Sequence, residues 1–74
     1  MNKMVKLDDI IIPRSFEKKK PKLDKLTERM EYFEQTGLFY VPIVVTDDLV
    51  LMDGYTSYLL AKKYNLTKVK VEYI

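Results

Sequence analysis

The residues best suited to chemistry form the stretch DGYTS, where an expected strand ends and an expected helix begins. The first amide groups of a helix lack intrahelical acceptors and carry partial positive charge, so such a junction can receive a phosphate group. Gly54 lets the backbone approach an anion closely, and the hydroxyls of Thr56 and Ser57 can donate hydrogen bonds to its oxygens. Tyr55 can lie against a base or ribose. This stretch therefore predicts a phosphate- or nucleotide-binding turn.

Two other interpretations of the same stretch stay open. In the structural one, Asp53 or a hydroxyl caps the helix, the glycine makes the turn, and nothing binds. In the catalytic one, Asp53 acts as a base or metal contact in magnesium-dependent phosphoryl transfer, a role that suits the aspartate side chain as a residue type. Asp47 and Asp48 could then share a Mg²⁺ ion with Asp53, although the adjacent pair is also typical of a tight turn.

The composition argues against most enzymatic chemistry. The chain has no histidine and no cysteine, which removes the usual base of near-neutral pKa, the thiolate nucleophile and the ligands of zinc. Catalysis would have to rest on carboxylates, lysines or hydroxyls. We therefore expect a protein that is not an enzyme, with phosphoryl transfer as the alternative.

Positive charge is concentrated in the first part of the chain. Residues 1–30 hold nine Lys or Arg side chains against five acids, and the surplus gathers in the run FEKKKPKLDKLTER. Such a run can meet a phosphate backbone or an acidic protein, or it can be a solvated loop. Interleaved acids weaken a role in nucleic-acid binding. The lysines that would carry such contact to DNA are Lys18, Lys19, Lys20 and Lys22.

Length and composition predict one small globular domain over residues 1–74. The apolar fraction is 47% and the charged fraction 32%, which is typical of a folded chain. No apolar run is long enough to span a membrane, and residues 1–12 do not read as a signal peptide. The absence of cysteine fits a reducing compartment. We expect a cytoplasmic protein that does not contact membranes.

The first half of the chain predicts an extended segment followed by a helix. The segment MVKLDDIIIP reads as a strand that ends at Pro13, and RSFEKKK reads as a polar connection. From Pro21 to Thr36 apolar residues recur at spacings of three and four, which is one face of a helix. Pro21 suits the first helical turn and Gly37 the left-handed residue after the last. That apolar face consists of Leu23, Leu26, Met30 and Phe33.

The second half predicts three short strands around a second helix. The run Ile43 to Val45 reads as a buried strand, and LVLM can return beside it as an antiparallel partner. A helix from Tyr55 to Tyr64 would turn Tyr55, Tyr58, Leu59 and Ala61 inward, and Asn65 would close it with Leu66 folding back. The segment KVKVEYI alternates as a half-exposed strand. The expected class is therefore α+β, with a mixed sheet packed against two main helices.

This order of elements resembles the ParB/sulfiredoxin-like domain over nearly the whole chain. The resemblance lies in the segments VKLDDIIIP, MEYFEQTGLFYVPIVV, LVLMDGYTSYLLAKKYNL and VKVEYI. It implies that the junction at Gly54 binds nucleotide phosphates: those of CTP in chromosome-partitioning members, of ATP in sulfiredoxins, and of a nucleotide in free-serine kinases. Members typically carry an arginine three residues after this glycine, where this chain has Ser57, so the resemblance implies a degenerate site. With no cysteine near Gly54, sulfiredoxin chemistry is excluded.

Two further expectations follow from the degenerate site. Arg14, directly after the first strand, could supply part of the missing charge to a nucleotide. Comparing the binding of ATP, CTP and GTP by the wild type and Arg14→Ala would test this.

Alternatively, the domain could serve as a regulator or inhibitor from a mobile element. It would then use an edge strand, such as VKVEYI or the first strand, to pair with a protein partner or a second copy. DNA association is a third alternative, although DNA readout in partitioning proteins resides largely in a downstream helix-turn-helix region.

Overall fold

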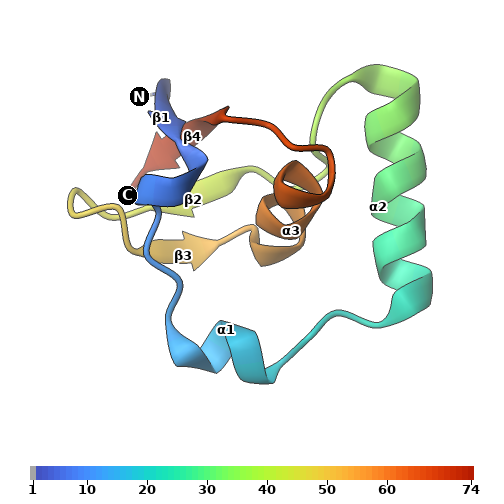
Figure 1. Ribbon diagram of the computed structural model, residues 1–74, viewed down its shortest axis with the longest axis horizontal. Helices are drawn as coiled ribbons and strands as arrows, with labels where there is room; N and C mark the ends of the chain where they lie inside the picture. The colour runs from blue at the N-terminus through green and yellow to red at the C-terminus, as the bar shows by residue number, and fades with distance from the viewer. Residues whose placement is uncertain (1) are drawn as a thin grey trace.

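Four strands form one mixed sheet in the computed structural model, which describes residues 2–74 (Figure 1). Their spatial order is β1-β4-β2-β3, in which β4 pairs antiparallel with β1 and parallel with β2, while β2 and β3 form an antiparallel hairpin. The predicted α+β class and mixed sheet are confirmed. The strands are β1 (Asn2–Lys6), β2 (Ile43–Val45), β3 (Leu51–Asp53) and β4 (Lys68–Tyr73).

Three α-helices and a 3₁₀ turn complete the described part of the chain, in the order given by Figure 1. The helix α3 packs against the sheet, whereas α2 stands at the side of the molecule and α1 lies apart from the strands. The bounds are η1 (Leu7–Asp9), α1 (Arg14–Lys18), α2 (Leu23–Thr36) and α3 (Tyr55–Lys63). The two predicted main helices are confirmed, and α1 is an addition to them.

The chain between β1 and α2 differs from the extended segment and polar connection predicted there. The strand ends at Lys6, and the 3₁₀ turn brings Leu7 and Ile10 into the core, where they are 4% and 5% exposed. Burying these two side chains favours a turn over a continued strand. The run RSFEKKK was predicted as a connection, but its first residues form α1. Pro21 also lies outside α2, whose N-cap is Lys22.

The core lies between one face of the sheet and α3. Val69 and Val71 of β4 face it together with Ile43 and Val45 of β2, and each of these side chains is at most 3% exposed. The predicted alternation in β4 is therefore confirmed. The helix contributes Tyr58 and Ala61 to the same cluster.

The helix ends follow local signals that the sequence carries. Gly37 closes α2 with φ 74°, and Asn65 follows α3 with φ 57°. The Asn65 amide donates to the Lys62 carbonyl at 3.1 Å, and the Leu66 amide donates to the Ala61 carbonyl at 3.0 Å. This pair of bonds is the Schellman arrangement, and it confirms the predicted closure at Asn65.

The strand β4 is an interior strand, which corrects the expectation that VKVEYI offers a free edge. It is paired on both sides, with β1 and with β2. The edges are β1 and β3, and part of the β3 side is occupied by Ile11, whose carbonyl accepts the Leu51 amide at 2.9 Å. Of the two segments named for edge pairing, only β1 keeps that geometry.

No helix within residues 2–74 is both long and apolar enough to cross a lipid bilayer.

Candidate functional site

A cavity of about 680 Å³ lies at the amino end of α3. One wall is the turn from β3 into α3, residues 53–56. The other wall comes from the chain between α1 and α2 and from the first turns of α2 (Figure 1). The predicted phosphate-binding turn thus opens into a cavity.

Gly54 places the start of α3 against the chain that leads into β2. Its φ is 84°, and a Cβ added there would lie 2.3 Å from the Pro42 carbonyl oxygen, so no other residue fits without moving the backbone. The Asp53 carboxylate accepts the Gly54 amide at 2.8 Å, and the Gly54 carbonyl accepts the Tyr58 amide at 3.0 Å. Asp53 therefore stabilises the turn itself, and its carboxylate does not cap the first turn of α3.

The first amide groups of α3 remain available to a ligand. Within residues 2–74, no side-chain or backbone acceptor takes the amides of Tyr55 and Thr56, both of which line the cavity. These groups carry the partial positive charge of a helix amino terminus. The side chain of Tyr55 lies against Phe16 of α1, with ring centroids 5.6 Å apart.

Ser57 was predicted to donate to a phosphate oxygen, but its hydroxyl donates to the Val41 carbonyl. The side chain is 3% exposed and does not line the cavity. Since a buried hydroxyl without a partner is destabilising, the bond accounts for a serine at this position. Ser57 therefore joins α3 to the segment before β2.

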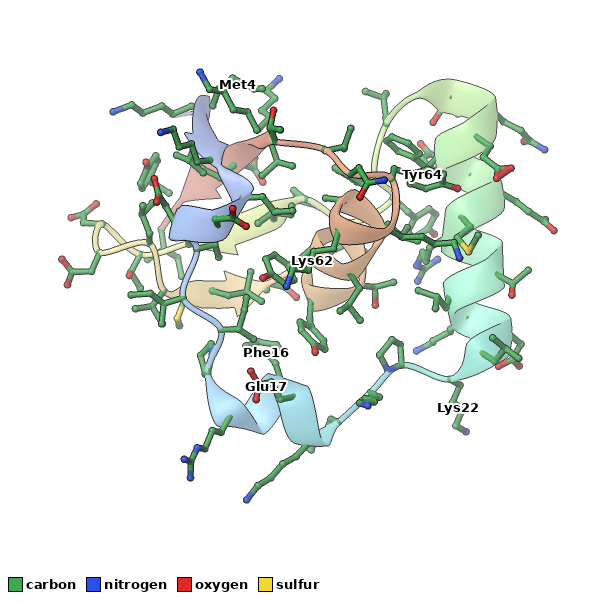
Figure 2. The ribbon with its side chains drawn as sticks, in the orientation of Figure 1. Met4, Phe16, Glu17, Lys22, Lys62 and Tyr64 are labelled. Atoms are coloured by element: carbon green, nitrogen blue, oxygen red, sulfur yellow. The ribbon has the colours of Figure 1, made fainter. Side chains whose placement is uncertain are left out.

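Cationic side chains gather around the cavity from the opposite wall. Five lysine and arginine residues line it against two carboxylates, those of Asp24 and Asp53, so its lining carries a surplus of positive charge. Arg29 is held in place by Tyr40, because its guanidinium carbon lies 3.9 Å from the centre of that ring. Figure 2 shows that the side chain of Lys22, at the start of α2, points away from α3. The cationic set is Lys19, Lys20, Lys22, Lys25 and Arg29.

Arg29 and Lys25 were missed as candidate site residues by the sequence interpretation. The signal that could have found them is their spacing, because Lys25 and Arg29 lie four residues apart on one side of α2, and Lys22, its N-cap, precedes Lys25 by three residues.

Arg14 and Lys18 do not line the cavity, although both were named as cationic candidates. Arg14 is the first residue of α1 and is exposed. In the same helix it is Phe16 that points toward α3 (Figure 2). The structure thus brings the lysines after α1 to the site and leaves the arginine that begins α1 outside it.

The three aspartates named for a shared magnesium ion do not come together. Asp47 and Asp48 form the turn between β2 and β3, as predicted, whereas Asp53 ends β3 at the other end of the hairpin. No group of three or more acidic side chains able to hold a metal forms among residues 2–74. The suggested metal site is therefore wrong, because β3 separates its ligands.

Comparison with known proteins supports the fold through solved structures. No protein-family model and no curated protein matches the sequence. Two structures of a pNOB8-like ParB N-domain superpose with TM-scores of 0.80 and 0.79, at 19% and 22% identity over 99% of this chain. Sulfiredoxin from Arabidopsis thaliana superposes with a TM-score of 0.80 at 25% identity, over all of this chain and 84% of that one. The chain spans only 29% and 26% of the two ParB chains.

Proposed function

We propose, from the premise that this chain is a ParB/sulfiredoxin-like domain, that the cavity at the amino end of α3 binds the phosphate groups of a nucleotide. The single observation that carries the proposal is the meeting of free helix amides with a cationic wall in one cavity. We further propose that binding is regulatory and that no reaction occurs there.

The argument for a phosphate ligand is electrostatic. The amides of Tyr55 and Thr56 present donors at fixed positions, and no acceptor within residues 2–74 takes them. Lys19, Lys20 and Arg29 add full charges from the opposite wall, and charge-assisted hydrogen bonds are about twice as strong as neutral ones. The opposite wall thus supplies cations that position 57 lacks.

The argument for a regulatory role comes from what Asp53 does. Its carboxylate accepts the amide of the next residue, which fixes the turn, and no group of three or more acidic side chains that could hold a metal forms among residues 2–74. A base for phosphoryl transfer needs both a free carboxylate and a positioned metal. We therefore propose binding without turnover.

The experiment is a thermal shift and calorimetric titration with ATP, CTP and GTP, each with and without Mg²⁺. A ligand present at about 100 times its dissociation constant stabilises the folded state by about 2.7 kcal/mol, which is a clear shift in melting temperature. We expect stabilisation by at least one nucleotide and by inorganic triphosphate. No stabilisation by any of them would overturn the proposal.

Charge variants locate the site. We expect Arg29→Gln and the pair Lys19→Gln with Lys20→Gln to weaken nucleotide binding by about tenfold, since each removes a charge-assisted contact. The matched control is Lys63→Gln, an exposed lysine at the far end of α3. Arg14→Ala tests whether Arg14 or Arg29 supplies the positive charge to the nucleotide. A loss of nucleotide affinity in Arg14→Ala, but none in Arg29→Gln, would assign that role to Arg14.

A DNA-binding function is the second candidate, because the same lysines lie on the surface around the cavity. It predicts that the protein binds duplex DNA with an affinity that falls steeply as salt rises. It also predicts that duplex DNA and the nucleotide compete for the same site on the protein. Nucleotide binding that is unaffected by an excess of DNA would favour the first candidate.

A further inference from the structure

The face of the sheet opposite α3 is uncovered along β1 and β4. Val69 and Val71 turn toward the core, so the alternate residues of β4 turn away from it and are exposed. Met4, the partner of Lys70 in β1, is 57% exposed and projects outward from the sheet (Figure 2). A methionine that is mostly exposed on an uncovered sheet face is an apolar side chain available for contact with a partner.

A groove of about 510 Å³ runs between this face and the loop that joins α2 to β2. We call it the sheet groove. Its apolar lining includes Phe33, Leu38 and Phe39 from the α2 side and Met4 from β1. Leu38 is 64% exposed, so the groove has an accessible apolar rim. Its lining shares no residue with the cavity at the amino end of α3.

Three lysines lie along the same face of the sheet. Lys6 and Lys68 are directly opposite partners in the β1–β4 ladder, and Lys70 follows two residues later on the same side. Like charges placed opposite each other in a sheet are destabilising. Among residues 2–74 no side-chain hydrogen bond engages any of these ammonium groups. Glu72 lies on the same face, so the lysine triad of Lys6, Lys68 and Lys70 leaves a surplus of positive charge there.

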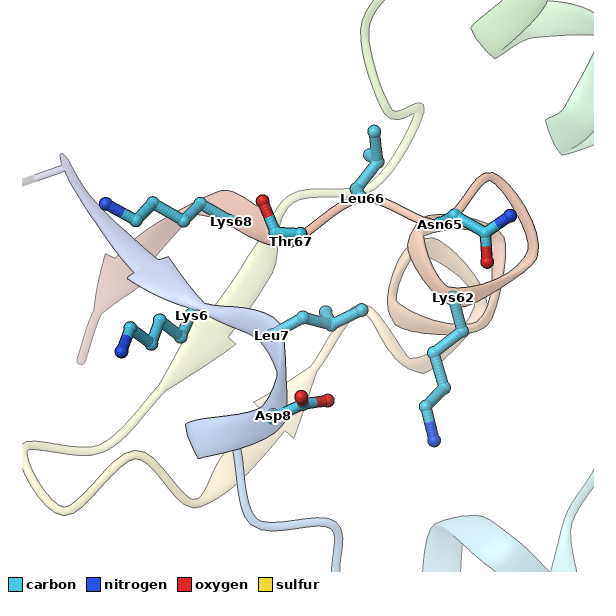
Figure 3. Close-up of a pocket in the computed structure, with 8 residues that line it drawn as sticks. All are labelled: Lys6, Leu7, Asp8, Lys62, Asn65, Leu66, Thr67 and Lys68. Carbon is cyan, nitrogen blue, oxygen red and sulfur yellow. The ribbon is translucent and has the colours of Figure 1, made fainter.

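Figure 3 shows where two of these charges point. Lys6 and Lys68 border a hollow of about 410 Å³ beside Leu7 and Leu66, but their side chains extend in the same direction, away from Leu66 and Lys62. The ammonium groups therefore do not converge on an ion inside this hollow. They are directed outward over the sheet, where a larger partner can reach them.

We propose that the sheet groove docks an acidic, amphipathic segment of a partner protein. Its apolar side chains would enter beside Leu38 and Met4, and its carboxylates would meet the lysine triad, which relieves the repulsion between Lys6 and Lys68. A second copy of this chain fits poorly, because face-to-face contact would set one triad against the other. A phosphodiester chain would meet the lysines but would leave the apolar rim unused. The proposal is independent of nucleotide binding, since the two sites share no residue.

The test measures fluorescence anisotropy with a fluorescein-labelled peptide of alternating glutamate and leucine residues. Two control peptides replace every glutamate by glutamine, or every leucine by serine. We expect the acidic apolar peptide to bind and both controls to bind at least about tenfold more weakly, because charge and apolar contact are both needed. Absence of binding by the first peptide, or equal binding by all three, would overturn the proposal.

Variants of the protein assign the peptide to the groove. The triple variant Lys6→Gln, Lys68→Gln, Lys70→Gln should lose about tenfold in affinity, and Leu38→Ser should lose affinity while keeping the charge. The matched control removes three lysines elsewhere: Lys3→Gln, Lys18→Gln, Lys63→Gln. All of the altered side chains are exposed, so none of these variants should lower the melting temperature substantially, and the variant without Lys6 and Lys68 should gain slightly because their repulsion is removed. Equal losses in the two triple variants would show attraction by net charge alone and would overturn the assignment.

Two further outcomes would replace the peptide with another occupant. A dimer in sedimentation equilibrium that dissociates in the Met4→Ser variant would make the groove a contact between copies. Displacement of the peptide by a duplex oligonucleotide from the wild type, but not from the matched control, would make the triad a nucleic-acid contact. Either result overturns the proposed partner, whereas nucleotide binding at α3 is measured separately and is unaffected by it.

Discussion

The helices α2 and α3 are secured to the domain in opposite ways. The nine-residue α3 buries Ser57, Tyr58, Leu60 and Ala61, whereas the fourteen-residue α2 buries no side chain. Phe33 of α2 contacts Tyr64, the residue that follows α3, with ring centroids 5.1 Å apart. The longer helix is therefore the less firmly attached of the two.

The comparison shows what can be concluded from apolar residues that recur at helical spacing. Leu26, Met30 and Phe33 of α2 have helical spacing, yet each is only half-buried, and Leu23 at the start of the stripe is 78% exposed. The stripe predicts that a helix forms, but how deeply the helix is buried depends on what packs against it. Around the cavity, the start of a helix with four buried side chains thus faces a helix that buries none.

The largest expected effect compares the glycines next to the two helices. Gly54→Ala should destabilise the domain by about 4 kcal/mol, because a Cβ would overlap the Pro42 carbonyl oxygen in a left-handed conformation. Gly37→Ala should cost only about 1 kcal/mol, since nothing lies within 4 Å of its Cβ position and only the backbone conformation is strained. Urea denaturation measures both. Similar losses would mean that the approach of α3 to Pro42 is not rigid.

A smaller effect is expected from truncating one side chain in each helix. Leu60→Ala in α3 removes a side chain that is 2% exposed and should cost about 3 kcal/mol. Met30→Ala in α2 removes a half-buried side chain and should cost about 1 kcal/mol. The free energy of unfolding from denaturant titration measures both. A larger loss for Met30→Ala would reverse the order of attachment given above.

The smallest effect concerns the polar contact between the helices. The Tyr64 hydroxyl donates a hydrogen bond to the Glu34 carboxylate at 3.0 Å. The pKa of the Tyr64 phenol is raised, first by desolvation and then by this hydrogen bond and the negative charge of Glu34. Because the folded pKa lies above the unfolded value of about 10, the added stability is present below that pH and is lost as pH rises through the folded pKa. Denaturation from about pH 8 to about pH 11 should show a shallower decline for Tyr64→Phe and Glu34→Gln. An unchanged decline would mean that the contact does not persist in solution.

Local signals in the sequence were enough to predict several elements. Gly37 and the pair Asn65 and Leu66 mark helix ends, because a left-handed residue and a following apolar contact depend only on neighbours in the chain. The alternation over residues 68–73 predicts a strand with one buried face for the same reason. The turn at Gly54 was likewise located from its residues, and its opening into a cavity follows from the position of α3.

Contacts between distant segments could not be predicted from these signals. The five-residue α1 is too short to show a helical period. The burial of Ser57 depends on the Val41 carbonyl, sixteen residues away. The cations of the cavity come from α2 and the chain before it, and nothing in their local pattern indicates that they face Gly54. The order of strands in the sheet likewise depends on contacts between distant segments and could not be predicted.

The interior place of β4 has a consequence for the order in which the domain can assemble during synthesis. The strand β1 and the hairpin of β2 and β3 share no ladder with each other, and β4 is the bridge between them. Until residues 68–73 have left the ribosome, the two parts of the sheet cannot join, so the nascent chain exposes both sides of the gap that β4 will fill. Completion of the sheet therefore waits for its last strand, and its slow step is the closure of long-range pairings.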